Sequence, residues 1–305
     1  MKRLQTSIDV IDQKERFQVD NRRNSMLANS EPLQQLMDLI EIPVLVQEKV
    51  NAAIEELQEQ EMITSVHKLL DPVTASAEAK WLSQLYKEES MKELAIHLYA
   101  ATISWKHIYQ PLQIPHEIYL ATMRAFTRFL KETKQADNQD VFDRGFWTWR
   151  YLCGLEFRID QLEFEMIAAD HKSKAPQLEG QAYLSLHIPS DAKLVHEQVQ
   201  ENYQSARMFF ETYFPAYASA PIVTDTWLLS PKLKEWLPAT SNLVLFGNDY
   251  ELLLTEPEKN DGVLWLFNTI SNDVSKYPEN TTLQKAAKAW LLAGNAIGSA
   301  VGRLK

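Results

Sequence analysis

The apolar residues in the first half of the chain recur at the spacing of three and four residues that is typical of amphipathic helices. The clearest stripe follows Pro43, a residue that suits the first turn of a helix because its missing N–H is not needed there. This stripe consists of Val46, Val50, Ile54 and Leu57. No convincing alternation of a strand interrupts the helical spacing between residues 43 and 135. The pattern therefore predicts an all-helical N-terminal domain over residues 1–135.

The polar run KETKQADNQD, residues 131–140, ends this helical region. It is rich in charged and amide side chains and has no apolar period, as is common in linkers. We therefore expect a domain boundary here, with a second domain over residues 136–305.

The segment GLEFRIDQLEFEMI, residues 154–167, shows the period of two that is typical of strands, but in two phases. Phe157 and Ile159 carry the first phase, and Leu162 and Phe164 carry the second. A strand cannot change phase without an extra residue. The sequence thus predicts a β-bulge or a bend at Asp160 and Gln161.

A second strand is predicted over residues 182–188, where apolar side chains alternate with Tyr183, Ser185 and His187. Pro189 ends this strand. An amphipathic helix beginning near Leu194 follows, and Ser190 or Asp191 is its expected N-cap.

The remaining C-terminal segments mix strand and helix patterns. PIVTDTWLLSP predicts a strand, PKLKEWL a short helix, and SNLVLFGNDYELLL a strand, a turn and another strand. Residues 282–297 have helical spacing. The predicted fold class is α+β, in which a helical domain precedes a mixed β-sheet domain flanked by helices.

Composition narrows the classes of partner and the compartment. The 305 residues carry a net charge of −10, which argues against a nucleic-acid or anionic membrane surface. The single cysteine, Cys153, excludes an intramolecular disulfide and fits a reducing cytoplasmic location. The N-terminus lacks an apolar signal region, and AWLLAGNAIGSAV is too short to span a membrane, which takes roughly 20 residues. The sequence leaves the oligomeric state open.

Six segments of the second half resemble, in the same order, the GNAT-like C-terminal domain of a family of bacterial acyltransferases. They are FRIDQLEFEM, LHIPSDAKL, SARMFFETYFP, TWLLSPKL, SNLVLFGNDY and TTLQKAAKAWLLAGNAIG. Members of that family pair this domain with a helical N-terminal domain. The resemblance implies a GNAT-like mixed sheet whose strands splay around CoA. It also implies acyl transfer from acyl-CoA or acetyl-CoA to an amine or hydroxyl of a small molecule.

The chain departs from the usual GNAT pattern at the phosphate loop. Typical GNAT enzymes hold the pyrophosphate of CoA on a glycine-containing loop that leads from a strand into a helix. The corresponding segment here, IPSDAKL, has no glycine. It carries Asp191, whose charge we expect to repel a diphosphate.

The two predicted strands supply the candidate catalytic residues. If they pair, Glu163 and Glu165 share a polar face with Ser185 and His187. A carboxylate can then orient His187 as a general base, with Glu163 as the first choice of partner and Glu165 as the second. The alternative is that this is the wet face of a sheet, or that His187 bonds the backbone at the strand end.

Candidate substrate-binding residues follow further along the chain. Asp225 and Trp227 share one parity of a predicted strand and suit an amine through charge pairing and cation–π attraction, although packing is the more frequent role of such a tryptophan. Ser241 and Asn242 offer hydrogen bonds to a ligand, or else form a turn. The histidines show no metal-binding spacing, so no metal is expected.

Two classes of function remain open at this point. One is an acyl-CoA-dependent acyltransferase. The other is a non-catalytic GNAT-like protein that binds a small molecule or a partner, because a fold alone does not determine function.

Overall fold

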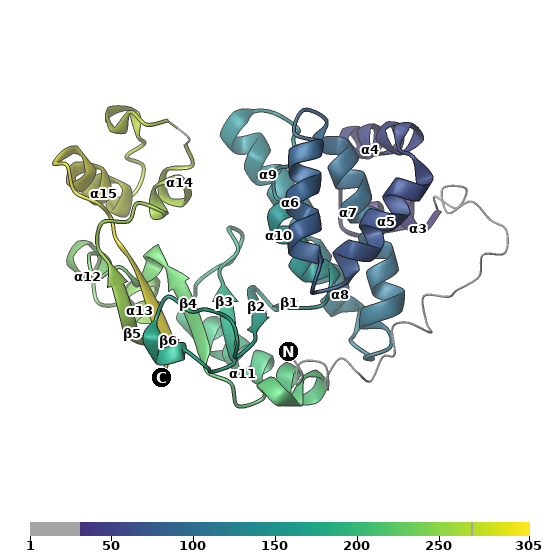
Figure 1. Ribbon diagram of the computed structural model, residues 1–305. Coiled ribbons are helices and arrows are strands. Elements are labelled where there is room, and N and C mark those ends of the chain that lie inside the picture. The colour runs from purple at the N-terminus through teal and green to yellow at the C-terminus, as the bar shows by residue number, and fades with distance from the viewer. Residues whose placement is uncertain (1–30, 270) are drawn as a thin grey trace. The chain divides into compact units, whose positions relative to one another are not determined.

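A computed structural model describes residues 31–305 except residue 270 (Figure 1). The predictions made for the first 30 residues, including the lack of a signal region, lie outside the described residues. Two compact units divide the chain. One extends to Thr133 and includes Asp140–Phe157, and the other comprises Lys134–Gln139 and Arg158–Lys305. None of the helices between residues 31 and 305 combines the length and the apolar character needed to cross a membrane.

The N-terminal unit is built from helices, as the apolar spacing predicts. Its elements are α3 (Glu31–Leu39), α4 (Val44–Glu56), α5 (Glu59–Leu70), α6 (Ala75–Leu85), α7 (Ser90–Ser104), the π-helical turn η2 (Trp105–Tyr109), α8 (His116–Met123), α9 (Ala125–Asp137) and α10 (Gly145–Leu152). α7 lies at the centre and packs against α3, α4, α5, α6 and α10. Val46 and Val50 of the predicted stripe are buried. Cys153 is also buried and forms no disulfide within the described residues.

The expected linker at residues 131–140 is helical over most of its length, because α9 continues to Asp137. The Thr133 hydroxyl donates to the carbonyl of Phe129, at 3.1 Å, and to Asp143 Oδ1, at 3.0 Å. The last turns of α9 are polar and lack an apolar period, as a linker does. Composition therefore could not distinguish a polar helix end from a linker. The compact units divide mainly at Phe157, within the first strand, and residues 140–157 belong with the N-terminal helices.

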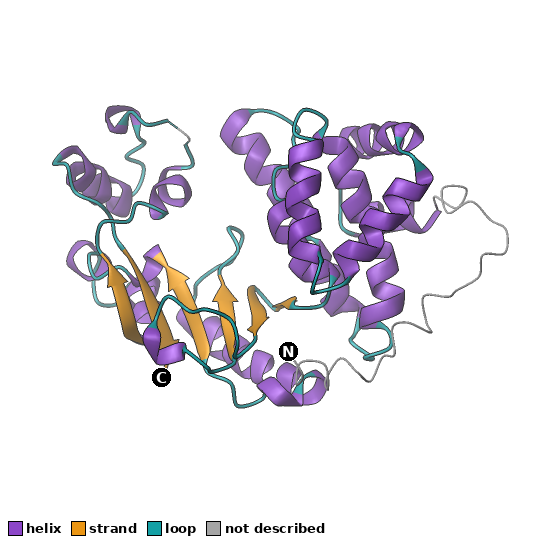
Figure 2. Ribbon diagram, viewed as in Figure 1, coloured by secondary structure: helices purple, strands orange, loops and turns teal. Residues whose placement is uncertain are grey.

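The C-terminal unit is organised around a six-stranded mixed sheet (Figure 2). Its strands are β1 (Glu156–Ile159), β2 (Leu162–Ile167), β3 (Tyr183–His187), β4 (Ile222–Thr226), β5 (Tyr250–Glu256) and β6 (Ser299–Leu304). Their order in the sheet is β1-β2-β3-β4-β6-β5. β3 and β4 are parallel, whereas β2–β3, β4–β6 and β5–β6 are antiparallel. The α+β fold class is therefore confirmed.

Helices and short 3₁₀ turns connect these strands. They are η3 (Pro176–Leu178), α11 (His196–Tyr213), η4 (Pro215–Tyr217), η5 (Trp227–Leu229), α12 (Leu233–Trp236), α13 (Asn242–Asn248), α14 (Gly262–Phe267), η6 (Val274–Lys276) and α15 (Thr282–Leu292). The predicted short helix before Leu237 and the C-terminal helix are confirmed, although α15 ends five residues earlier than expected.

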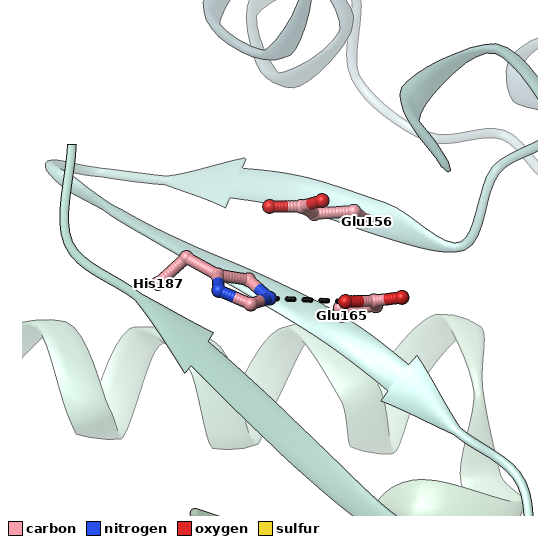
Figure 3. A group of neighbouring side chains, drawn as sticks. All are labelled: Glu156, Glu165 and His187. Atoms are coloured by element: carbon pink, nitrogen blue, oxygen red, sulfur yellow. Dashed lines mark hydrogen bonds and ion pairs between the residues drawn. The ribbon is translucent and has the colours of Figure 1, made fainter. Parts of the chain in front are cut away.

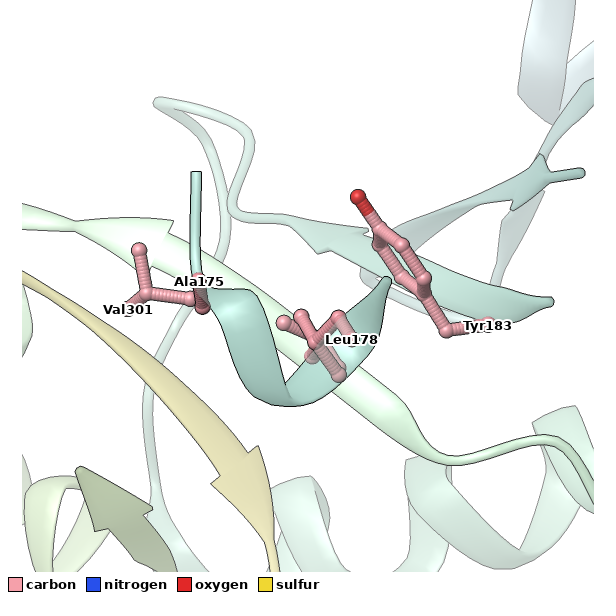
Figure 4. Packing of buried hydrophobic residues seen from close by; sticks show 5 residues of the cluster. Ala175, Leu178, Tyr183 and Val301 are labelled. Carbon is pink, nitrogen blue, oxygen red and sulfur yellow. The ribbon is translucent and has the colours of Figure 1, made fainter. Parts of the chain in front are cut away.

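The two faces of the sheet are covered differently. On the α11 face, Phe164 contacts Phe210 of α11. Tyr203 of α11 and Tyr250 of β5 share a hydrogen bond of 2.9 Å between their hydroxyls. On the opposite face, which we call the η3 face, Ala175 and Leu178 of the β2–β3 connection pack on Tyr183, Val223 and Val301 (Figure 4).

The phase change at Asp160 and Gln161 is a two-residue turn that separates β1 from β2, rather than a bulge inside one strand. Asp160 takes a left-handed φ of 52°, which aspartate tolerates better than most residues. Asn202 of α11 secures the turn. Its amide donates to the Ile159 carbonyl at 2.7 Å and accepts from the Leu162 N–H at 3.0 Å.

Three other elements differ from the sequence-based expectation. Residues 242–248, expected as a strand, form α13, because a short apolar run fits a buried helix as well as a buried strand. β6 (Ser299–Leu304) was not predicted and follows the expected end of the C-terminal helix at residue 297. α11 begins at His196, and neither Ser190 nor Asp191 caps it, since the N-cap position falls on Val195.

Candidate active site on the sheet

The antiparallel pairing of β2 and β3 places the predicted polar residues on one face of the sheet. Its register aligns Glu163 with His187 and Glu165 with Ser185, so the three charged or titratable side chains project from the η3 face. His187 Nε2 lies 3.0 Å from Glu165 Oε2 (Figure 3). The side chains are partly enclosed, with 25% of His187 and 11% of Glu165 exposed.

The histidine–carboxylate pair that the sequence predicts therefore exists, with Glu165 as the hydrogen-bonded partner. Glu163 was the first choice for this position, and it lies directly across from His187 in the register. The imidazole instead extends diagonally across the strand pair. Its Nε2 contacts Glu165, which is two residues beyond Glu163 on β2.

Glu156 joins this pair from β1, and the sequence patterns did not single it out. Oxygen atoms of Glu156 and Glu165 and a ring nitrogen of His187 all lie within 4.8 Å of one another (Figure 3). The three residues have the ligand types that would hold a divalent cation. The change of phase at Asp160 and Gln161 was the available sequence signal. If it is interpreted as a turn, the chain reverses and Glu156 comes close to Glu165, whereas a bend within one strand would keep them apart.

The parallel pairing of β3 with β4 ends just before this group. It aligns Leu184 with Ile222 and Ser185 with Val223. His187 and Asp225 both follow these pairs on the η3 face. His187 thus lies at the carboxyl end of β3, a strand that runs parallel to its neighbour β4.

The loop between β3 and α11 is held by polar contacts to the β1–β2 turn. Arg158 Nη1 lies 2.8 Å from Asp191 Oδ1 and 3.1 Å from its Oδ2. The backbone N–H of Lys193 donates to Gln161 Oε1 at 2.8 Å. The expected repulsion of a diphosphate by Asp191 is therefore offset in this structure, because the guanidinium balances the carboxylate charge.

Asp225 lies on the η3 face of β4, and its carboxylate contacts an ammonium group of the chain itself. Lys174 Nζ is 2.5 Å from Asp225 Oδ2. Tyr183 lies on the same face of the sheet. Burial raises the pKa of the Tyr183 hydroxyl, and the negative charges of Glu165 and Asp225 raise it further.

The other predicted substrate-binding residues lie in different surroundings. β4 ends at Thr226, so Trp227 belongs to η5 and does not share the strand face of Asp225. The ring of Trp227 lies against Gly262 and packs on a core cluster that includes Phe267 and Tyr277. Ser241 and Asn242 stand at the start of α13 and not before a strand.

A second histidine–carboxylate contact occurs at the first turn of α11. His196 Nε2 lies 3.0 Å from Asp249 Oδ1, and the Gln200 amide donates to Asp249 Oδ2 at 2.8 Å. All three side chains tie α11 to the junction of α13 and β5. This contact accounts for the position at which α11 begins, and it requires no catalytic role for His196.

The helical unit and the mixed sheet define a two-domain α+β protein. Residues 31–154 match the family model of the N-acyltransferase N-terminal domain, and residues 156–304 match that of the GNAT-like C-terminal domain. The chain belongs to the family of acyltransferases that joins these two domains in this order.

Solved structures of acyltransferases share this fold. One in complex with decanoyl-CoA and teicoplanin is 20% identical, with a TM-score of 0.73 and coverage of 90% of this chain and 88% of that chain. A mutant acyltransferase in complex with octanoyl-CoA has a TM-score of 0.72 at the same identity and coverage. A third structure, with CoA and 10C-teicoplanin, has a TM-score of 0.71, again at 20% identity and with coverage of 90% and 88%. A search of curated proteins gives no significant match.

Proposed function

We propose that this protein transfers an acyl group from acyl-CoA to an amine or hydroxyl of a small molecule, and that the reaction takes place on the η3 face. The observation that carries the proposal is the hydrogen bond between His187 and Glu165, placed where the pairing of the parallel strands β3 and β4 ends. Family membership supports the reaction class. The acyl-CoA and teicoplanin complexes of the structural neighbours support a thioester donor and a small-molecule acceptor.

In the proposed mechanism, His187 is the general base and Glu165 orients it. A carboxylate accepts hydrogen bonds, so the Nε2–H of His187 donates to Glu165 and the lone pair resides on Nδ1. The acceptor nitrogen or oxygen attacks the thioester carbonyl carbon. The C–S bond then breaks, CoA leaves as the thiolate, and the acceptor proton passes to Nδ1. Backbone amides stabilise the oxyanion.

The assignment of the remaining site residues is part of the same proposal. Glu163 and Glu156 line the site beside the imidazole. Asp225 receives the positive end of an amine acceptor. No metal ion has a role in this mechanism, in which His187 Nε2 is already bonded to Glu165.

We also infer a cytoplasmic location and a bacterial source. The first is supported by the single, buried Cys153, which is compatible with a reducing compartment. The second is supported by the family resemblance alone.

The donor is tested first by thermal denaturation with CoA, acetyl-CoA and longer acyl-CoAs. A ligand that binds the native state raises the melting temperature. Stabilisation by at least one thioester is expected. Indifference to all of them would favour the alternative, a non-catalytic GNAT-like binding protein.

The catalytic assignment is tested by substitutions at the histidine pair. His187→Ala is expected to lower kcat by about 10²- to 10⁴-fold, the usual contribution of a general base, while leaving stabilisation by acyl-CoA intact. Glu165→Gln is expected to lower kcat less and to shift the pH–rate profile. His171→Ala, which removes an exposed histidine of the same unit, is the control. Unchanged turnover in a folded His187→Ala protein would refute the assignment but not the donor.

A further inference from the structure

Asp225 is engaged by an ammonium group that belongs to the protein. Lys174 Nζ lies 2.5 Å from Asp225 Oδ2 and 4.0 Å from Glu256 Oε2. The Lys174 side chain is 57% exposed, and that of Asp225 is 36% exposed. An ion pair of this exposure is weak, because water screens it and the lysine loses rotamer freedom in forming it. A competing cation can therefore replace Lys174 at little cost.

The position of Lys174 is fixed by its neighbours in the chain. Ala175 and Leu178 are fully or almost fully buried on the η3 face, against Tyr183, Val223 and Val301 (Figure 4). Lys174 directly precedes the anchor Ala175. The packed segment that contains Ala175 and Leu178 therefore holds the Lys174 ammonium beside Asp225.

The ion pair is on the same sheet face as the histidine pair. Asp225 follows Val223 on β4, as His187 follows Ser185 on β3, and Val223 and Ser185 are aligned in the parallel register. A group bound at Asp225 therefore lies on the same sheet face as His187, beyond the last aligned pair of the two parallel strands.

We propose that Lys174 is an internal occupant of the acceptor's ammonium site, and that it competes with the acceptor for Asp225. This inference rests on the proposed function. A primary amine enters as an ammonium ion and replaces the charge of Lys174 at Asp225. It gives up one proton to His187 before it attacks the thioester, and the second proton released on amide formation passes to the departing CoA thiolate. A neutral alcohol cannot replace the charge of Lys174, so the ion pair persists in its presence.

The test measures binding in the full-length protein without any acyl-CoA, so its outcome does not depend on turnover. The probes are n-hexylammonium and the neutral 1-hexanol, titrated by ligand-observed NMR. Lys174→Ala is expected to tighten n-hexylammonium binding about two- to fivefold, which is the range expected from the loss of one exposed ion pair. Asp225→Asn is expected to weaken it, and 1-hexanol binding is expected to change in neither variant.

Two matched variants separate a local effect from a change in overall charge. Lys172→Ala removes an exposed lysine of the same segment, and Glu251→Gln removes a carboxylate of the same sheet that pairs with Arg303. Neither is expected to alter n-hexylammonium binding. The inference is overturned if Lys172→Ala matches Lys174→Ala, or if n-hexylammonium binds equally well to Asp225→Asn. Acyl-CoA stabilisation and turnover are measured separately, so failure here leaves the acyl-transfer proposal standing, and the reverse also holds.

Discussion

Two titratable residues one helical turn apart on α7 are buried in the N-terminal unit. Glu93 is 2% exposed and accepts a hydrogen bond from the Ser83 hydroxyl. Burial raises its pKa to about 7, a shift that the Ser83 contact opposes and nearby Asp143 increases. His97 is fully buried with Nδ1 2.8 Å from the Thr148 hydroxyl, and burial lowers its pKa to about 3. Both side chains therefore favour their neutral forms in the folded protein.

The raised pKa of Glu93 predicts a pH dependence of stability. Because the folded-state pKa exceeds the ordinary value of 4.5, the stabilising contribution is complete below pH 4.5 and is lost as the pH rises through 7. Glu93→Gln, which is neutral throughout, is expected to be more stable than the wild type at pH 8 by roughly 2–3 kcal/mol. Urea unfolding at pH 5 and pH 8 measures this difference.

Glu88→Gln is the control for that experiment, because Glu88 is exposed just before α7. It is expected to leave the pH dependence of the wild type unchanged. Equal slopes of unfolding free energy against pH in the wild type and Glu93→Gln would contradict the explanation.

At the scale of elements, β6 lies in the interior of the sheet, between β4 and β5, and its small residues permit close packing. A Cβ at Gly302 would lie 2.5 Å from the side chain of Leu229 and 3.0 Å from Cβ of Tyr250. The strand therefore needs glycine at this position to accommodate its neighbours.

Gly302→Ala is accordingly expected to destabilise the protein by about 1–3 kcal/mol, the usual cost of overpacking a core. Gly247→Ala provides the comparison. Among the described residues, the nearest neighbour of its added Cβ would be the Leu228 carbonyl oxygen at 3.8 Å, and alanine favours the α13 helix. Chemical denaturation should show a loss for the first variant and none for the second. Equal stability of the two variants would refute this account of β6.

The sequence predicted those elements that have a sustained periodic pattern or a residue such as proline at their end. β3 was located by its alternation and by Pro189, and the helical N-terminal unit by its repeated stripes. α13 was missed because its run of four apolar residues, 243–246, carries no period that separates helix from strand. β6 was missed because its alanine and glycine are neither β-branched nor aromatic.

The candidate site was predictable only in part, for a related reason. Parity along a strand places His187 and Glu165 on one face, but it does not give their distance. Glu156 required the chain reversal at Asp160, which depends on a tertiary contact with Asn202 more than 40 residues away. The Lys174–Asp225 pair joins residues 51 positions apart, and no local pattern relates them.

At the scale of the whole molecule, the net charge of −10 bears on how a polyanionic donor arrives. Acyl-CoA carries several phosphate charges, so long-range repulsion slows its encounter with an acidic protein. Salt screens this repulsion, because the Debye length falls from about 30 Å at 0.01 M to about 8 Å at 0.15 M.

The association rate of acyl-CoA is therefore expected to rise several-fold between 0.01 M and 0.15 M NaCl, as measured by stopped-flow mixing. The thioester S-acetyl-N-acetylcysteamine, which has no phosphate, is expected to show no such change. A fall in the association rate with salt would mean that local cations, such as Arg158 and Lys193, outweigh the overall charge.

The position of β6 also has a consequence for biosynthesis. A ribosome delivers residues 299–304 after all the other strands, yet they fill the gap between β4 and β5. Until they leave the exit tunnel, both strands present open edges, which are the surfaces most prone to pair with other chains. The nascent C-terminal unit is thus exposed to misassociation during translation, and a deletion of residues 299–304 would leave that exposure permanent.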